Sequence, residues 1–397
     1  MITAKADSIW SQTFALLCLA QLLGYAHSAL LTPTIPLYVT HLGGSPFVVG
    51  LVLAAFATTS VLLRPLIGYW ADTWSEASVL ASGCLVMGIS LSLFFIPIAG
   101  TAMLANGLRG MGWAGLNTGG YALLALIAPV TRRGEASGYY SGVQAGASIL
   151  FPAVALWLID APLGGFRVVL VLSAALAFTG GIIGLVLGRH APSGAGNQPS
   201  GSAGLARMNP FALVERELLL PSALLFCLNL TYPAVGGFLV LYARTIGIEN
   251  IAWYFVASGS TSLLARPALG RLGDRIGCGP SLAAGFILEI FALLLLTAAS
   301  GLALVLVSGV LFALGNAIGS ATTLALAIQR ANPQRRGRAM ASFSIAYPMA
   351  AGVGALLTGS AVAIAGYFWM YLMAAALAAA GLLVALTNWS NLSGSKT

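Results

Sequence analysis

Twelve apolar stretches of about 20 residues run through the 397-residue chain and constrain its fold more than any other feature. A helix of this length spans the ~30 Å hydrocarbon core of a membrane. We place the stretches at 11–38, 47–70, 79–98, 102–127, 136–158, 166–188, 218–243, 250–271, 279–298, 301–329, 338–361 and 366–388. Only 7% of the residues are charged and 59% are hydrophobic, which cannot supply the surface of a soluble domain. The sequence therefore predicts an all-α membrane protein with 12 transmembrane helices.

A segment rich in Gly, Ser and Pro interrupts this series between residues 189 and 217. Such a composition is typical of flexible linkers. It separates six predicted helices from six. We therefore expect an N-terminal six-helix bundle over 1–188, a cytoplasmic linker over 189–217 and a C-terminal six-helix bundle over 218–397. The first stretch is too long for a signal-peptide core, so we expect it to remain a helix.

The positions of the basic residues predict the orientation of the chain. If the N-terminus is cytoplasmic, 13 of the 18 Lys and Arg residues fall in cytoplasmic segments and two, Arg167 and Arg244, fall outside. The positive-inside rule then places both termini in the cytoplasm. The net charge of +8 is spread thinly over short loops, so we expect no nucleic-acid partner.

The sequence contains no pattern typical of metal, cofactor or catalytic sites. The four cysteines lie in or beside apolar stretches without a CxxC pair, which predicts buried thiols; they are Cys18, Cys84, Cys227 and Cys278. The three histidines lie on separate segments, and neither HExxH, GxSxG nor GxxxxGK[ST] occurs. We therefore expect no metal and no cofactor, and neither an ATP-driven pump nor a channel.

The chain repeats itself at an interval of about 200 residues. The segment 64–72, RPLIGYWAD, returns as RPALGRLGD at 266–274, an offset of 202. RRGEA at 132–136 returns as RRGRA at 335–339, an offset of 203, and Leu-Tyr at 37–38 returns at 241–242, an offset of 204. Three matches at nearly one offset, on equivalent loops, predict that the two halves are parallel structural repeats.

This architecture, with RPxxGxxxD after the second and eighth helices, resembles the major facilitator superfamily of secondary transporters. The segment 270–277, GRLGDRIG, is similar to the loop signature G-x-L-A-D-R-x-G-R of that family. The first copy departs from it after Asp72, because residues 73–76 supply no base. The resemblance implies transport by alternating access in a bacterial cytoplasmic (inner) membrane, by a monomer.

The loop motifs supply the expected gate. Gly68 and Gly270 would let another helix approach closely, since they have no side chain. Asp72 and Asp274 lie at helix ends, where a carboxylate accepts hydrogen bonds from the exposed amides of a neighbouring helix. The resemblance implies that Arg133 and Arg336 pair with these acids across the halves. The alternative is a static cap that only holds the fold.

In the family, the first, fourth, seventh and tenth helices line the central cavity. The matching helices here carry polar or aromatic side chains at helical spacing, and a polar stripe facing lipid would be costly. The expected substrate-binding residues are Gln21, Tyr25, Asn106, Arg109, Trp113, Asn117, Tyr121, Asn229, Tyr232 and Asn316. Hydrogen bonding between helices, without substrate contact, is the alternative.

Arg109 is the first of these candidates. The segment 106–114, NGLRGMGWA, resembles the fourth-helix motif R-x-x-Q-G-x-G-x-A of the family. Asn106 stands at the position of the arginine, and Arg109 stands one turn later on the same predicted cavity face. No acid lies within the first six helices to pair with it. Because a buried charge needs compensation, we expect an anionic or carboxylate-bearing substrate.

Two residues are candidates for proton coupling. Glu289 is the only acid well inside a predicted span, and an intramembrane carboxylate is a functional hypothesis by default. Its helix, the ninth, is peripheral in the family. His27 titrates near neutral pH, but it lies about 120° from the polar stripe of its own helix. A packed, hydrogen-bonded histidine is therefore the alternative for His27.

The expected function is proton-coupled export of an amphipathic or carboxylate-bearing small molecule, such as a drug, a siderophore or another metabolite. The fifth-helix antiporter signature of the family, G-x-x-x-G-P-x-x-G, is partly retained: Pro152 is present, but Phe151 and Ala155 stand where glycines occur. A proton-coupled importing symporter for an organic anion or sugar is the first alternative. A membrane-embedded enzyme is a remote one. Protons, the small molecule and the lipid bilayer are the expected partners.

Overall fold

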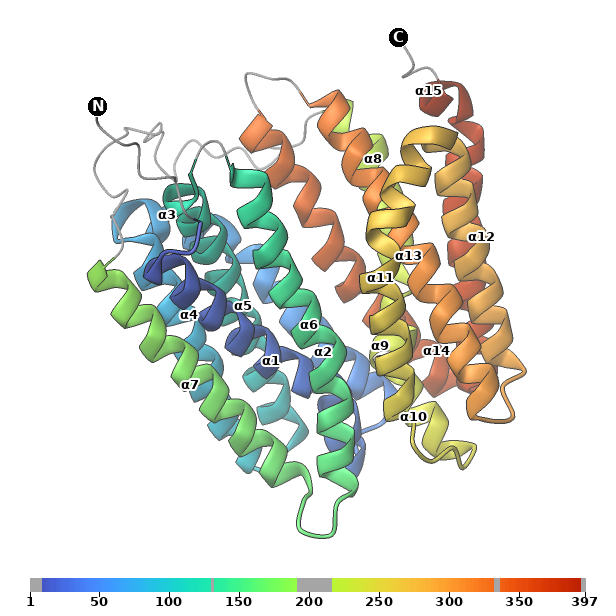
Figure 1. Cartoon of the computed structure of the whole chain (residues 1–397). Coiled ribbons are helices and arrows are strands. Elements are labelled where there is room, and N and C mark those ends of the chain that lie inside the picture. Colours follow the sequence, from blue (N-terminus) through green and yellow to red (C-terminus); the bar gives the residue numbers. More distant parts are fainter. Residues whose placement is uncertain (1–8, 130–131, 191–215, 332–335, 394–397) are drawn as a thin grey trace. The chain divides into compact units, whose positions relative to one another are not determined.

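The regular elements of the described residues are all helices in the computed structural model shown in Figure 1. The structure describes residues 9–129, 132–190, 216–331 and 336–393. Within these ranges it gives only the backbone for residues 72, 133–134, 216, 266–275, 336–342 and 393. The predicted all-α fold class is confirmed.

The first half of the chain forms the first six predicted spans, two of them from two consecutive elements. Its elements are α1 (Gln12–His41), α2 (Pro46–Leu62), α3 (Arg64–Thr73), α4 (Glu76–Ser90), the 3-10 helix η1 (Leu91–Phe95), α5 (Ala99–Ile127), α6 (Arg133–Asp160) and α7 (Phe166–His190). α2 and α3 are bent by 45° at Leu63. Pro65 lies in the first turn of α3, where it lacks the N–H that would continue the ladder of α2.

The second half forms the remaining six spans. Its elements are η5 (Arg216–Leu218), α8 (Leu219–Leu230), α9 (Tyr232–Gly236), α10 (Phe238–Thr245), α11 (Ala252–Ile276), α12 (Cys278–Thr297), α13 (Leu302–Arg330), α14 (Arg336–Thr387) and α15 (Trp389–Ser393). α8, α9 and α10 together occupy the predicted span 218–243. α14 contains two helices that meet at Gly366, whose φ of +84° suits a residue without a side chain.

Eight helices of the described residues are long and apolar enough to cross a membrane, and the bent pair α2–α3 would make nine. One of the eight covers both helices of α14. α5 is outside this set because glycines and the polar residues Asn106, Arg109 and Asn117 lower its hydropathy. α11 is also outside the set. The protein is thus a multi-pass membrane protein in which two of the long described helices, α5 and α11, are less apolar than the others.

The chain divides into two compact units. Unit 1 comprises residues 1–34 and 58–200, and unit 2 comprises residues 35–57 and 201–397. Residues 35–57 belong with the second unit because α2 packs on α14: Gly50 and Gly359 approach so closely that a Cβ on Gly50 would lie 3.2 Å from Gly359 Cα. The predicted linker falls mostly on residues 191–215, outside the described ranges, so that three-part division stays a prediction.

The same glycine crossing occurs once in each unit. In unit 1, a Cβ on Gly83 of α4 would lie 2.6 Å from the Gly112 carbonyl oxygen of α5. In unit 2, a Cβ on Gly315 of α13 would lie 2.6 Å from the Gly285 carbonyl oxygen of α12. Gly83 and Gly285 are 202 residues apart, and Gly112 and Gly315 are 203 apart. The packing thus repeats at the offsets of the sequence motifs.

A second contact aligns α1 with α8. Leu116 of α5 fills the space above Gly24 of α1, and in unit 2 Leu228 of α8 fills the space above Gly319 of α13. The glycine and leucine have exchanged places, but the contact is equivalent. Gly24 and Leu228 are 204 residues apart. Positions on α1, α4 and α5 therefore have assigned counterparts on α8, α12 and α13.

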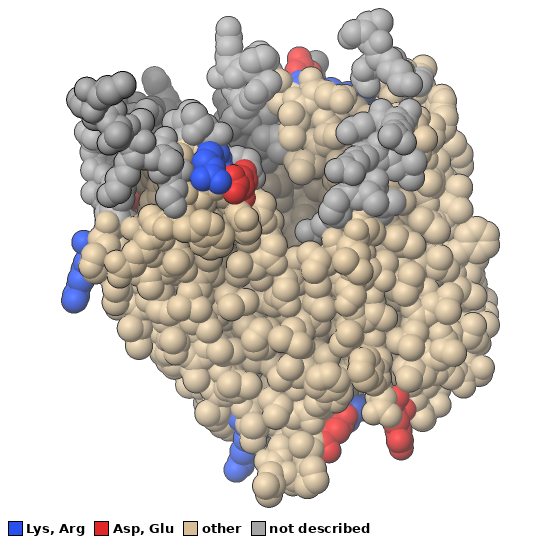
Figure 2. All heavy atoms as spheres, in the orientation of Figure 1, with Lys and Arg blue, Asp and Glu red and all other residues tan. Residues whose placement is uncertain are grey.

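Charged side chains lie at the ends of the helices in each unit, and the side chains between them in this view are uncharged (Figure 2). Apolar side chains also fill the interior of unit 1, where Leu17, Leu80, Leu116 and Leu123 are buried. Charged side chains are thus confined to the helix ends, and the helices between them have the uncharged length that a membrane core requires.

We predict that Gly83→Ala destabilises the protein and that Gly142→Ala does not. A methyl group on Gly83 would meet backbone atoms of α5, which cannot move without separating the helices, and overpacking of this kind costs about 1–3 kcal/mol. Gly142 of α6, in the same unit, has open space around its Cα. Thermal unfolding of the purified variants measures the difference. Equal melting temperatures would show that the crossing is not tight.

Candidate functional site

Three predicted binding residues of unit 1 form one cluster between α1 and α5. The Tyr25 hydroxyl donates a hydrogen bond to Asn117 Oδ1 at 2.9 Å. The rings of Tyr25 and Trp113 lie with centroids 4.5 Å apart, and Asn117 Nδ2 donates to the Trp113 carbonyl at 2.9 Å. Asn117 thus holds the Tyr25 hydroxyl, Trp113 packs on the Tyr25 ring, and the cluster offers an apolar ring surface with a polar edge.

Arg109 lies in a second, deeper cluster of unit 1. Its guanidinium donates from Nε to His27 Nε2 at 3.3 Å and from a terminal nitrogen to Asn106 Oδ1. His27 Nδ1 lies 3.0 Å from the carbonyl oxygen of Ser173 on α7, and the Ser173 hydroxyl donates to the His27 carbonyl at 3.1 Å. The cluster therefore joins α1, α5 and α7.

These contacts determine the tautomer of His27. An arginine nitrogen can only donate, so His27 Nε2 accepts and carries no proton. His27 Nδ1 then carries the proton and donates to the Ser173 carbonyl. A second proton on His27 would break the bond to Arg109 and place two cations side by side. In the structure His27 is packed and hydrogen-bonded, which was the alternative to a role in proton coupling.

Arg109 is buried, as a charge that needs compensation was expected to be, and a neighbouring side chain covers the predicted cavity face of α5. Only 3% of the residue is exposed, because His27 reaches it from α1. Helical periodicity places Arg109 and Trp113 on one face of α5, but it does not show which neighbouring side chain covers that face. His27, which points away from the stripe of its own helix, provides this cover.

Gln21 and Tyr121 of unit 1 differ in solvent exposure. Gln21 is fully buried, whereas 47% of Tyr121 is exposed. The Tyr121 hydroxyl donates to Gln144 Oε1 of α6 at 3.2 Å, and its ring packs edge-on against Tyr140. Tyr140 and Gln144 were not predicted from the sequence, although a polar pair at i and i+4 within an apolar span was an available signal.

Arg64 is a further residue that the sequence analysis did not place in the site. Arg64 is the first residue of α3, directly after the bend from α2, and its guanidinium lies close enough to Tyr25 for an electrostatic interaction. The available signal was an arginine inside a predicted span, which the repeat motif obscured.

Glu289 occupies the interior of unit 2 and contacts the predicted cavity helix. Its side chain is fully buried, and Asn316 Nδ2 of α13 donates to Glu289 Oε1 at 3.4 Å. Ser320 continues the chain by donating to Asn316 Oδ1 at 3.4 Å. The Thr231 hydroxyl also faces this carboxyl group. Glu289 Oε2 has no hydrogen-bond partner among the residues that the structure describes.

The counterpart of Glu289 in unit 1 is Met87. Both side chains pack beside the glycine crossing: a Cβ on Gly315 would lie 3.0 Å from Glu289 Cγ, and a Cβ on Gly112 would lie 2.6 Å from Met87 Cγ. The fold therefore accepts an apolar side chain at this place, and the carboxyl group is not needed to form the crossing.

The other two predicted binding residues of unit 2 differ in exposure. Asn229 of α8 is buried, and its amide donates to the Leu225 carbonyl of the preceding turn at 2.9 Å. Tyr232, the first residue of α9, is partly exposed. Asn229 thus satisfies its amide within its own helix, whereas Tyr232 presents its ring beyond it.

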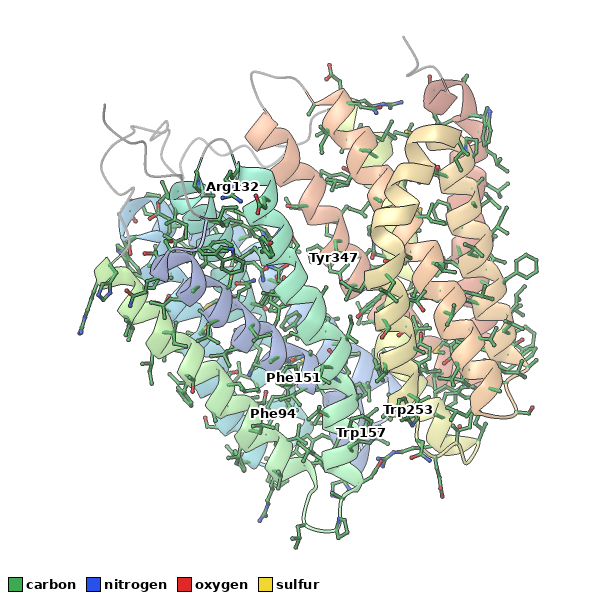
Figure 3. The ribbon with its side chains drawn as sticks, viewed as in Figure 1. Phe94, Arg132, Phe151, Trp157, Trp253 and Tyr347 are labelled. Atoms are coloured by element: carbon green, nitrogen blue, oxygen red, sulfur yellow. The ribbon has the colours of Figure 1, made fainter. Side chains whose placement is uncertain are left out.

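Most of the predicted gate falls outside the described side chains. Those of Asp72, Arg133, Asp274 and Arg336 are not described, and neither is the surrounding of Gly270. A Cβ on Gly68 would meet no described atom within 4 Å, so the close helix approach expected there is not seen in the described part of the chain. At the start of α6, labelled in Figure 3, Arg132 pairs with Glu135 at 2.8 Å.

Within the described ranges, no three His, Cys, Asp or Glu side chains are grouped as a metal ion would require.

Comparison with known proteins identifies a family that covers most of the chain and relatives that cover part of it. The sequence profile of the family described as Major Facilitator Superfamily matches residues 17–258 and 234–390. The multi-drug resistance efflux pump PmrA of Streptococcus pneumoniae is 27% identical over 281 residues, which cover 68% of each chain. Multidrug resistance protein MdtG of Klebsiella pneumoniae is 27% identical over 312 residues, covering 74% of this chain and 73% of MdtG. Quinolone resistance protein NorA of Staphylococcus aureus is 24% identical over 217 residues, 54% of each chain.

Solved structures share the fold at low sequence identity. A POT family transporter in complex with 5-aminolevulinic acid superimposes with a TM-score of 0.80 at 11% identity, covering 96% of both chains. The nucleoside transporter NupG gives a TM-score of 0.72 at 14% identity, covering 96% of this chain and 99% of NupG. The predicted fold is confirmed by these matches.

We predict that His27 and Arg109 are energetically coupled. His27→Leu leaves a buried arginine donor without its acceptor, and Arg109→Leu leaves the His27 acceptor unpaired, whereas the double variant removes both groups. The counterparts in unit 2, Thr231 and Phe312, show that the fold tolerates the change. A double-mutant cycle on the free energy of unfolding should give a coupling of about 1–3 kcal/mol.

Thr179→Val is the control for that cycle, because the Thr179 hydroxyl is exposed and bonds only within α7 at 2.8 Å in the described contacts. It should change stability by less than about 0.5 kcal/mol. Additive single effects of His27→Leu and Arg109→Leu would contradict the contact.

Proposed function

The chain belongs to the Major Facilitator Superfamily, and on that premise we propose that it exports a small molecule in exchange for protons. Members of this family are secondary transporters, so the chain is a transporter and the membrane-enzyme alternative is set aside. The direction of transport, the class of substrate and the coupling to protons are our proposal.

The similarity to bacterial efflux proteins is the observation that carries the direction of transport. PmrA, MdtG and NorA are named as efflux or resistance proteins, and the first two match more than two thirds of this chain. From these relatives we infer that the protein lies in the bacterial cytoplasmic membrane. The 13-to-2 distribution of basic residues supports cytoplasmic termini. The protein acts as a monomer, in which residues 1–188 rock against 218–397.

The clusters of unit 1 support an amphipathic, carboxylate-bearing substrate. Tyr25 and Trp113 offer ring surface for an apolar body, and Asn117 offers an amide. Arg64 lies beside Tyr25, and Arg109 lies one turn from Trp113 on α5. The sequence places no acid within the interior of the first six helices, so these arginines favour a negative group on the ligand. A drug, a siderophore or another metabolite can have this chemistry.

Glu289 is the proposed proton carrier. In a membrane interior its neutral form is tolerated, while its anion requires compensation by donors or by a change of state. Asn316 and Ser320 extend from Glu289 along α13, so a change of charge on Glu289 alters the hydrogen bonds of the predicted cavity helix. One proton moving down 100 mV releases about 2.3 kcal/mol, which supports a roughly 50-fold gradient of a neutral substrate.

An importing symporter for an organic anion or sugar is the second candidate. The arginines of unit 1 suit an imported anion as well as an exported one. The direction of substrate movement under an imposed proton gradient separates the two functions.

Everted membrane vesicles with a respiration-generated proton gradient test the proposal. Cationic drugs, carboxylate metabolites and siderophores are added while a pH-sensitive dye reports the gradient, for wild type, Arg109→Ala and Glu289→Gln. Exchange predicts that one compound class dissipates the gradient and that the variants lose this response. No response to any compound, together with uptake into right-side-out cells, would instead establish the symporter.

We predict that Glu289→Met folds but no longer couples transport to protons. Methionine is the residue at the equivalent place of unit 1, so it should fit beside Gly315 with a melting temperature at or above that of wild type. The rate of proton release on substrate addition should fall at least tenfold, which corresponds to an increase of about 1.4 kcal/mol in the activation free energy. Met87→Leu, the matched change in unit 1, should leave coupling unchanged. Normal coupling in Glu289→Met would remove Glu289 from the mechanism.

A further inference from the structure

Three polar side chains in the interior of unit 1 have hydrogen-bonding atoms that no described residue satisfies. Gln21 of α1 and Tyr140 of α6 are fully buried, and Gln144 of α6 is 8% exposed. Gln21 Nε2 and Oε1, the Tyr140 hydroxyl and Gln144 Nε2 have no hydrogen-bond partner within the described ranges. Each such atom costs about 1–3 kcal/mol when it is left unpaired, so the group calls for an occupant that supplies the missing bonds.

Gly120 of α5 brings two of these side chains, Gln21 and Tyr140, to one place. A Cβ on Gly120 would overlap the Tyr140 hydroxyl and would lie 3.0 Å from Gln21 Oε1. The amide of Gln21 and the hydroxyl of Tyr140 therefore meet over the one residue that leaves room for both. Tyr121, the next residue of α5, bonds to the other end of Gln144 and packs on the Tyr140 ring. Its exposed side chain forms the outer edge of the group.

The repeat shows that folding does not require these polar atoms. At the offset of 204 fixed by the α1 and α8 contacts, Leu225 of α8 is the counterpart of Gln21. At the offset of 203 between the motifs that begin at 132 and 335, Phe343 of α14 is the counterpart of Tyr140. Leu225 and Phe343 are buried in one apolar cluster of unit 2. Tyr347, labelled in Figure 3, is the counterpart of Gln144. The same architecture is thus completed by apolar and aromatic side chains in unit 2, and unit 1 alone carries the amides.

We propose that Gln21, Tyr140 and Gln144 form a buried subsite, built over Gly120, that binds a neutral hydrogen-bonding group of the transported compound. Two amides and a hydroxyl supply both donors and acceptors and no net charge, which suits a carbonyl, hydroxyl or amide. Ordered water offers the same chemistry and occupies the subsite when no substrate is bound. Tyr121 exchanges its bond to Gln144 for the incoming group.

This subsite rests on the proposed transport function, so its test includes a measurement that does not require transport. Radiolytic hydroxyl-radical labelling modifies buried side chains that lie beside bound water, and it is read by mass spectrometry on the purified full-length protein. We expect Tyr140 to be modified in the ligand-free wild type. Norfloxacin, which carries a carbonyl and a carboxylate, should reduce the modification at least about threefold. Tetraphenylphosphonium, which has no hydrogen-bonding group, should leave it unchanged.

Variants that copy the side chains of one repeat into the other separate binding from folding. Gln21→Leu with Tyr140→Phe installs the side chains of unit 2, so its ligand-free melting temperature should equal or exceed that of wild type. Its KM for norfloxacin should rise at least about tenfold, as expected for the loss of 1.4 kcal/mol. Leu225→Gln with Phe343→Tyr is the reverse control and should lower the melting temperature, because the apolar cluster described around these two residues cannot satisfy the added polar atoms.

Each contrary result has a distinct meaning. An unmodified Tyr140 in wild type, or a lower melting temperature in Gln21→Leu with Tyr140→Phe, would show a dry structural network and overturn the subsite. Modification that no compound of the panel reduces, whether or not it is transported, would assign the place to ordered water only and overturn substrate binding. Failure of proton exchange in vesicles bears on the proposed function and leaves the Tyr140 result to be read by itself.

Discussion

Lipid offers a transmembrane helix no hydrogen-bond partner, so every polar side chain inside these bundles must be satisfied by the protein or by what it binds. Most described hydroxyls meet this requirement within their own helix, as Thr34 does with the Leu30 carbonyl at 2.6 Å and Thr358 with the Gly354 carbonyl at 2.7 Å. The polar groups that helices cannot satisfy in this way are gathered in a few places. Those places are where we assign binding and proton exchange.

The internal repeat separates folding from function in a way that one bundle alone could not. Equivalent glycine crossings hold α4 on α5 and α12 on α13, so both halves solve the same packing problem. Where the halves differ in polarity at equivalent positions, packing does not explain the difference. Glu289 of the second half stands where the first half has a methionine. Arg109 and Gln21 of the first half stand where the second half has a phenylalanine and a leucine. We therefore assign, as part of the proposal, ligand binding to unit 1 and the proton-carrying carboxyl group to unit 2.

Sequence periodicity predicted the fold and the stripes, but not the contacts between stripes. The described part of each of the 12 predicted stretches is largely helical, and spacing on α1 and α5 placed Tyr25 and Asn117 on faces that do meet. The contact of His27 with Arg109 joins residues 82 positions apart, and it depends on how α1 rotates against α5 and α7. A helical wheel describes one helix and contains no such rotation. For the same reason Ser173, Tyr140 and Gln144 were not identified, although each lies in a predicted span.

The most direct test of this account is one variant that carries Gln21→Leu, Tyr140→Phe and Glu289→Met together. Thermal unfolding and substrate-driven proton movement would be measured on the same proteoliposome preparation, beside wild type. The account predicts a melting temperature equal to or above that of wild type and no substrate-driven proton movement. A lower melting temperature with transport retained per folded molecule would show that these polar groups support the fold, and it would contradict the account.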